Sequence, residues 1–251
     1  MDLWQYLAIF ALGILCGVIN VLAGGGSNLV LPLLMLYGLP PSVANGTNRV
    51  GILLQNLVGV WAFQRHGRLP TADLPAIFAW VSGGGLLGAL FAAELPEALL
   101  KILLLGSMLT VSTVVLFLPN VILAGADERP RRVRQTPSAQ LGLFLAGLYG
   151  GFVQAGVGFI LITAIAGSLR YDLVATNALK LVGTIFFTVI ALAIFIYHDQ
   201  VNWPLGLSLA AGNMWGAHLG VKAALSIRPK TMKILLFAMT LVAVLSALIN
   251  E

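Results

Sequence analysis

Two cationic residues lie inside stretches that are otherwise apolar enough for a lipid bilayer. Arg49 and Lys180 end two runs, Ala44 to Arg49 and Ala175 to Lys180, that align at a constant offset. A cation at membrane depth costs about 2.5–3.5 kcal/mol even on a lenient insertion scale, so such residues usually serve a function. Snorkelling to the membrane surface is the alternative. We expect at least one of the two to face the path of an anionic substrate.

Glycines and neutral hydrogen-bond donors cluster near these cations. They stand where helices are expected to begin, and the unpaired N–H groups and the dipole of a helix start favour an anion. Alternatively, the polar side chains only cap helices and the glycines only allow close packing. The candidate substrate-binding residues are Gly24, Gly25, Gly26, Ser27, Asn28, Asn45, Gly46, Thr47, Asn48, Arg49, Gln154, Gly156, Gly158, Thr176, Asn177 and Lys180, with Gln55 and Asn56 as further lining candidates.

No set of residues suited to catalysis stands out. His66, His198 and His218 lack metal-ligand spacing, and Cys16 is the one cysteine, so the sequence predicts no metal site, no cofactor and no disulfide. We therefore do not expect an enzyme.

All nine Asp and Glu residues map to loops, termini or helix ends. A carboxylate that carries protons at depth is thus not expected. Transport would be driven by the membrane potential and the substrate gradient, or by a proton carried on the substrate. A sodium site built from carbonyls and hydroxyls stays open.

The composition places the chain in a membrane. Hydrophobic residues make up 59% of the 251 positions and charged residues 9%, against about 25% charged residues in a soluble domain. Although the pI is about 9.7, the basic residues lie mostly in short loops, as in cytoplasmic loops of membrane proteins, so nucleic acid is not an expected partner.

The sequence predicts an all-α polytopic membrane protein with ten apolar segments. They cover residues 3–22, 29–39, 44–64, 72–92, 96–118, 140–157, 159–170, 174–197, 204–225 and 231–249. Residues 29–39 and 159–170 are too short to span about 30 Å of hydrocarbon, and each follows a glycine-rich break. The first segment lacks the basic start and cleavage site of a signal peptide, so we expect it to be retained.

The segments form two sets of five that resemble each other. Besides the runs at Arg49 and Lys180, Lys101 aligns with Lys233, and Gly88 aligns with Gly220. We therefore predict a first repeat over residues 1–119, a basic cytoplasmic linker over 120–140 and a second repeat over 141–251. Each repeat would hold a broken or re-entrant helical hairpin and three long transmembrane helices.

Loop charges predict that the repeats are inverted. The arginine-rich linker and the loop at 65–68 should be cytoplasmic, whereas Glu94, Glu97 and the loop at 197–200 should be external, as should both termini. Inverted repeats with broken helices are typical of secondary transporters, whose site lies near the midplane at the repeat interface.

The residues at the breaks resemble the signatures of the TauE/SafE family of membrane transporters. The similar runs are Leu22 to Ser27 with Pro32, Pro40 to Thr47, and Gly147 to Gly151 with Gly156 and Gly158. The second half departs from the pattern, since Thr163 stands where Pro32 would match and Asn177-Ala178 where Gly46-Thr47 would.

This resemblance implies a multi-pass transporter in the cell (inner or plasma) membrane that moves a small anion by alternating access. The implied substrate is a sulfur-containing anion such as sulfite, sulfoacetate or a related organosulfonate or carboxylate. An anion channel and a non-transporting membrane assembly factor are the alternatives. The expected partners are the anion and the bilayer, and a homodimer is kept open.

Overall fold

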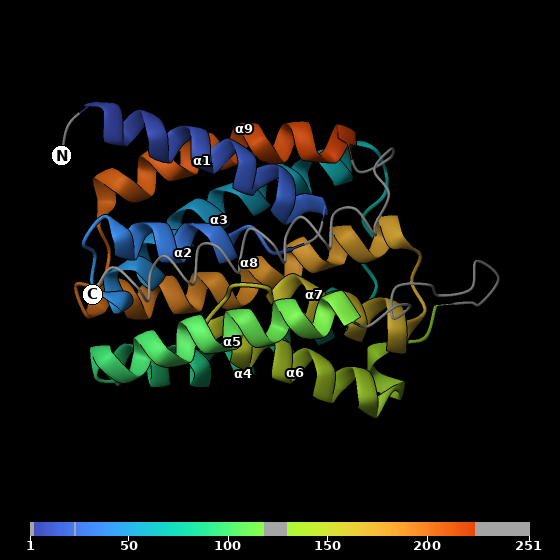
Figure 1. Ribbon diagram of the computed structural model, residues 1–251. Helices are drawn as coiled ribbons and strands as arrows, with labels where there is room; N and C mark the ends of the chain where they lie inside the picture. Colours follow the sequence, from blue (N-terminus) through green and yellow to red (C-terminus); the bar gives the residue numbers. More distant parts are fainter. Residues whose placement is uncertain (1–2, 23, 118–129, 224–251) are drawn as a thin grey trace.

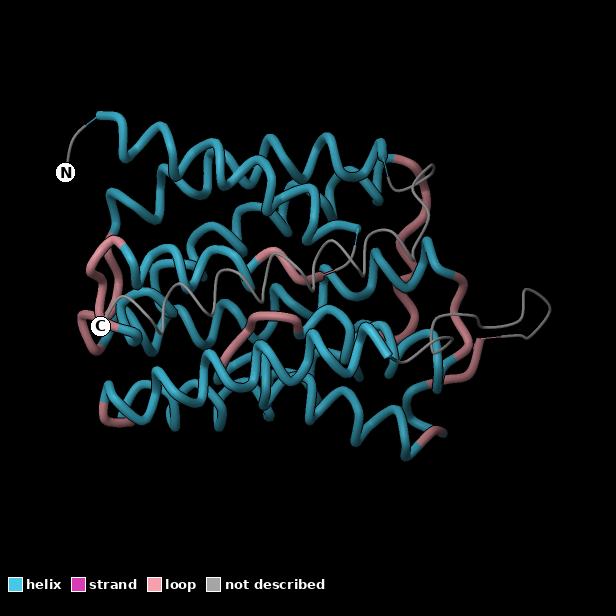
Figure 2. The backbone as a smooth tube through the Cα atoms, in the orientation of Figure 1, coloured by secondary structure: helices cyan, strands magenta, loops and turns pink. Residues whose placement is uncertain are grey.

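The computed structural model describes residues 3–22, 24–117 and 130–223, and these residues form helices and loops without any strand (Figures 1 and 2). The helices are α1 (Leu3–Leu22), α2 (Ser27–Leu36), α3 (Pro41–Arg65), α4 (Leu74–Glu94), α5 (Glu97–Phe117), the 3-10 turn η1 (Val133–Gln135), α6 (Pro137–Phe152), α7 (Val157–Ile162) continued by the π-helical turn η2 (Thr163–Ser168), α8 (Leu173–Tyr197) and α9 (Trp203–Ala223).

Four of the described helices are long and apolar enough to cross a membrane. They contain the windows Trp4–Val21, Leu74–Glu94, Glu97–Val114 and Val174–Tyr197. Helix α3 is as long as α8, at 25 residues, but carries the polar run that includes Arg49. Large apolar side chains such as Trp61, Phe91 and Ile102 are exposed on the outside of the bundle, which suits contact with lipid. The all-helical, apolar chain is compatible with a membrane protein.

The predicted segments match the observed helices with two corrections. Residues 140–157 do not form one helix, because α6 ends at Phe152, where Gln154 (φ 65°) and Gly156 (φ 76°) leave the helical conformation. The predicted linker is shorter at its end, because residues 137–140 form the first turn of α6. The predicted segment at 231–249 lies outside the described residues.

Helices from the two halves of the sequence interleave. Helix α1 packs on α9 at one edge, α4 packs on α6 at the opposite edge, and α3 and α8 lie between (Figure 1). The first helix of each half, α1 or α6, thus packs mainly against a helix of the other half.

The two edge pairs use glycines in corresponding places. Gly84 and Gly88 of α4 lie against the backbone of α6 at Phe144 and Leu148, and on α9 Gly212 and Gly216 lie in the same way against Phe10 and Ile14 of α1. Small residues let helix backbones approach closely. Gly220, which the sequence aligns with Gly88, lies against Val18 of α1 one turn further along.

Polar contacts tie the loops together at both ends of the bundle. At one end the carboxylate of Glu97 accepts hydrogen bonds from the backbone N–H and the hydroxyl of Ser42, so it caps the start of α3 from another helix. The amide of Gln200 donates to the Ala93 carbonyl at the same end (2.9 Å).

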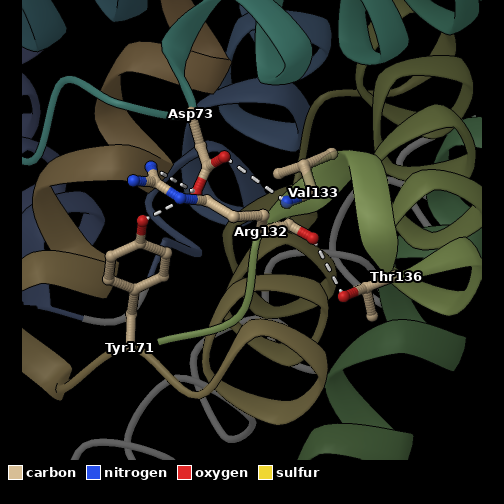
Figure 3. Close-up of polar contacts among 5 residues, drawn as sticks. All are labelled: Asp73, Arg132, Val133, Thr136 and Tyr171. Atoms are coloured by element: carbon tan, nitrogen blue, oxygen red, sulfur yellow. Dashed lines mark hydrogen bonds and ion pairs between the residues drawn. The ribbon is translucent and has the colours of Figure 1, made fainter. Parts of the chain in front are cut away.

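At the other end the cluster is centred on Asp73, directly before α4 (Figure 3). Its carboxylate accepts a hydrogen bond from the Tyr171 hydroxyl (2.8 Å) and a longer one from the Val133 N–H (3.4 Å). A guanidinium nitrogen of Arg132 lies 3.9 Å away. Asp73 therefore joins the start of α4 to the end of the linker and to the loop before α8.

Candidate functional site

One break lies between α1 and the short helix α2, and the other between α6 and the short helix α7. The two breaks meet at one point inside the bundle. A Cβ atom added to Gly24 would lie 2.5 Å from the Cα of Gly158, and one added to Gly158 would overlap Gly24 in the same way. Since real Cβ contacts are not this short, only glycine fits on either side. Gly24 also has a φ of 77°, a conformation that glycine adopts at little cost. The breaks are therefore in backbone contact.

Lys180 reaches across this point to the end of α1. Its ammonium donates to the carbonyl oxygens of Asn20 (3.2 Å) and Val21 (3.0 Å) and to Oδ1 of Asn177 (3.0 Å). The last carbonyls of a helix have no partner within it and carry partial negative charge. Lys180 thus caps the first helix of the other half of the chain.

Arg49 makes the corresponding contact with α6. Its guanidinium donates to the carbonyl oxygens of Gly150 (3.0 Å) and Gly151 (2.6 Å), in the last turn of that helix. It also lies 4.8 Å from the centre of the Phe195 ring, a cation–π distance. Both cations are fully buried, and both close the end of a helix that would otherwise leave carbonyls unpaired.

A narrow polar cavity lies beside the meeting point of the breaks, about halfway along α3 and α8. The space among its lining atoms, some of it open to the outside, is about 290 Å³. Its lining residues are Asn20, Gly24, Ser27, Ile52, Asn56, Gln154, Val157, Gly158, Lys180, Leu181 and Thr184.

Buried amides leave hydrogen-bonding capacity in and around this cavity. Nδ2 of Asn56 and Oε1 of Gln154 are buried without a partner, although the other end of Gln154 donates to the Thr188 hydroxyl (3.0 Å). A hydroxyl can also donate, so the amide of Gln154 can turn to present its N–H₂ group instead. A buried polar group without a partner costs about 1–3 kcal/mol, which a bound polar ligand would remove.

The cavity brings together part of the predicted set. Gly24, Ser27, Gln154, Gly158 and Lys180 line it, and so does the further candidate Asn56. Gly25, Gly26 and Gly156 belong to the breaks without lining the cavity.

The other predicted residues support the helices around the cavity. Asn28 donates to Ser112 on α5 (2.7 Å), and Asn48 donates to the lining hydroxyl of Ser27 (3.0 Å). Asn45 donates to the carbonyl of Phe152 at the end of α6 (2.8 Å). It lies a turn inside α3, because the helix begins at Pro41 and not near Asn45 as expected.

Three more of the predicted residues lie toward the helix ends. The hydroxyl of Thr47 accepts from the N–H of Asn202 (2.9 Å), and that of Thr176 donates to the Tyr171 carbonyl (3.2 Å). Gly46 packs against the Gln200 carbonyl, where a side chain would not fit. Asn177 holds the Lys180 ammonium, and Arg49 is not among the lining residues.

Sequence reasoning missed Asn20 and Thr184 as lining residues. Asn20 is a buried amide in an apolar helix, and its side chain accepts from the Gly26 N–H (2.7 Å) and donates to Gln55 (3.2 Å). A lone polar residue in a membrane helix is itself a signal for a site. Thr184 carries a weaker signal, because a threonine in such a helix commonly bonds to the carbonyl one turn before it, as here to Lys180 (2.8 Å).

Among the described residues, no group of His, Cys, Asp and Glu side chains is placed to hold a metal ion. His218 lies exposed on α9, away from the cavity lining.

Comparison with known proteins places the chain in a family. Its residues 9–247 match the family described as Sulfite exporter TauE/SafE. A probable membrane transporter protein of Haemophilus influenzae is 29% identical over 237 residues, which cover 92% of this chain and 91% of that protein. The probable membrane transporter protein YfcA of Escherichia coli K12 is 25% identical over 218 residues, 87% of this chain and 80% of that protein. The chain belongs to the sulfite exporter TauE/SafE family.

Proposed function

We propose that this protein is a secondary transporter that moves a small anion across the membrane by alternating access, with the anion bound in the cavity beside Lys180. The observation that carries the proposal is the buried ammonium in the cavity wall, with neutral oxygens as its hydrogen-bond partners. An uncompensated buried charge is unfavourable, so an anion in the cavity would stabilise it.

The remaining lining chemistry supports an anion rather than a cation. None of the described lining residues carries a carboxylate. The hydroxyl of Ser27 accepts from Asn48 and keeps its own proton to donate, and Asn56 has a free N–H. Neutral donors and one cation are the groups that bind sulfonates and carboxylates in proteins.

The arrangement of the helices supports a carrier. Helix α1 packs on α9 as α6 packs on α4. Arg49 of the first half caps α6, and Lys180 of the second half caps α1. This arrangement is expected for two inverted repeats related by an axis near Gly24 and Gly158. In such proteins one repeat moves against the other around a fixed midplane site.

Two layers of packed side chains flank the cavity toward the two ends of the bundle. Toward the Asp73 cluster lies a buried group formed by Phe63 of α3 and by Ala178 and Leu181 of α8. Toward the other end lie Arg49 and Phe195. Separating α3 from α8 at either layer would open the cavity to one side at a time.

The family description names sulfite, and we propose a sulfur-containing anion such as sulfite, sulfoacetate or a related organosulfonate or carboxylate as the substrate. The names of the compared relatives state no substrate. We further propose that the protein lies in the inner or plasma membrane with both termini outside, and that it forms a homodimer. No catalytic activity is part of it.

Thermal stabilisation of the purified protein across a panel of anions tests the site. A ligand present at 100 times its Kd should stabilise the folded protein by about 2.7 kcal/mol. We expect sulfoacetate or sulfite to raise Tm more than chloride, and Lys180→Gln to lose the effect. Lys101→Gln, near the start of α5, is the matched control. Equal Tm shifts in wild type and Lys180→Gln would contradict this site.

Transport by proteoliposomes separates the alternative functions. A carrier gives saturable counter-exchange, whereas a channel gives flux that follows the gradient without exchange. An assembly factor would instead tolerate replacement of both Arg49 and Lys180 without loss of function.

A further inference from the structure

The ammonium of Lys180 has all three of its N–H groups in use, and no described residue supplies a counter-ion. The three acceptors are the carbonyls of Asn20 and Val21 and the side chain of Asn177, at 3.0–3.2 Å. Lysine has three donors and no acceptor, so these bonds satisfy its hydrogen-bonding needs completely. They do not neutralise its charge, because each acceptor is a neutral dipole. Only 1% of the residue surface is exposed to water.

Among the residues that the structure describes, no other titratable or charged group lines the cavity to compensate this charge. The side facing Lys180 from α2 and α3 presents Ser27, Ile52 and Asn56, and the second break presents Gln154, Val157 and Gly158. On its own helix Thr184 and Asn177 are neutral. The titratable Cys16 is buried on α1, a turn before Asn20, and Arg49 is held by the α6 carbonyls.

The charge state of Lys180 is therefore linked to the occupant of the cavity. An anion near the ammonium stabilises its protonated form, and departure of the anion removes that stabilisation. Linkage is reciprocal, so protonation must raise anion affinity by the same factor that the anion raises proton affinity. The neutral amine would also gain a lone pair, for which the unpartnered Nδ2 of Asn56 is a donor in the same cavity.

We propose that Lys180 is the coupling-proton site of the carrier: it takes up one proton from solution when an anion enters the cavity and releases it when the anion leaves. This inference rests on the proposed anion site. Arg49 does not share the role, because a guanidinium stays protonated in proteins. A lysine in this place supplies the proton carrier that the sequence does not offer as a carboxylate at membrane depth.

Proton uptake on anion binding tests the inference. Sulfoacetate is added to purified wild-type protein in weakly buffered solution with a pH indicator, at a series of pH values from about 5 to 10, and binding is measured in parallel by thermal stabilisation. Sulfoacetate is fully ionised over most of this range, so it neither takes up nor releases protons itself. We expect uptake to rise toward one proton per bound anion on the alkaline side, where affinity should fall up to tenfold per pH unit.

Lys180→Arg is the informative variant, because it keeps the positive charge but cannot lose it. It should bind sulfoacetate without proton uptake and with an affinity independent of pH. Binding by wild type with no uptake anywhere in the range would overturn the coupling role while leaving the anion site intact, whether or not the variant folds. Uptake that persists in a folded Lys180→Arg protein would also overturn it. Absence of any stabilisation of wild type by sulfoacetate and the rest of the anion panel would overturn the anion site and the coupling role together.

Discussion

The backbones of Gly24 and Gly158 touch, although one belongs to the first break in the chain and the other to the second. A Cβ atom on Gly24 would lie 2.5 Å from the Gly158 Cα. This contact brings the ends of α1 and α6 close to the starts of the short helices. It thereby sets the spacing of the cavity that Ser27, Gln154 and Lys180 line.

Gly158→Ala should lower both stability and anion affinity. The added methyl group has no room against Gly24, and overpacking typically costs about 1–3 kcal/mol. Gly106→Ala on α5 is the control, because no described residue lies within 4 Å of its added Cβ and alanine favours a helix. Thermal unfolding and anion-induced stabilisation measure the two effects. An unchanged Gly158→Ala protein would show that the breaks are not packed as described.

Arg49→Gln should destabilise the protein more than it weakens anion binding. The substitution leaves the carbonyls of Gly150 and Gly151 without their present donors, at about 1–3 kcal/mol for each unpaired group. Because Lys180 lines the cavity and Arg49 does not, Lys180→Gln should lose more affinity. The Kd values of the two variants, each divided by the wild-type Kd, measure which substitution loses more affinity. A larger loss of affinity in folded Arg49→Gln than in Lys180→Gln would mean that the anion binds nearer to α6 than proposed.

Tyr171→Phe should change the stability of the protein at alkaline pH. Burial and the hydrogen bond to Asp73 raise the pKa of Tyr171 to about 12, above the usual value of about 10. The neutral phenol therefore contributes stability that is fully present below pH 10 and is lost as pH rises toward 12.

Unfolding of wild type and Tyr171→Phe by denaturant at pH 8 and pH 11 measures this difference. At pH 8 the variant should be less stable by about 1.5–3 kcal/mol, the usual value of a hydrogen bond to a charged group. The gap should narrow at pH 11. A gap that stays constant between the two values would mean that the phenol does not titrate as the contact with Asp73 requires.

Single cysteines test the predicted orientation. Ser138 at the start of α6 lies at the end of the bundle that holds Asp73 and Arg132, and Glu94 at the end of α4 lies at the other end. An impermeant thiol reagent applied to intact cells should label Glu94→Cys but not Ser138→Cys. Native Cys16 is buried and stays in place as an unreactive background. The reverse labelling pattern would invert the whole topology.

Much of the fold could be predicted from the chain alone. Apolar runs without charges specify helices in a bilayer, since every backbone group there must be bonded internally. The positions of α1 to α5 and of α8 followed from these runs, and the glycine-rich stretches marked both breaks. The predicted end of α6 was wrong, because the helix is ended at Gln154, a non-glycine residue with a φ of 65°. No local sequence pattern predicts that conformation.

Residue types alone determined that this chain would bury two cations among amides and glycines in an apolar bundle. They did not determine which cation meets a ligand. Arg49 and Lys180 occupy matching places in sequence, yet only Lys180 lines the cavity. That distinction was decided by the tertiary structure, because it depends on where α1 and α6 end and on which carbonyls each cation reaches across the bundle. Contacts between residues far apart in the chain follow from packing in three dimensions, on which the periodicity of either helix carries no information.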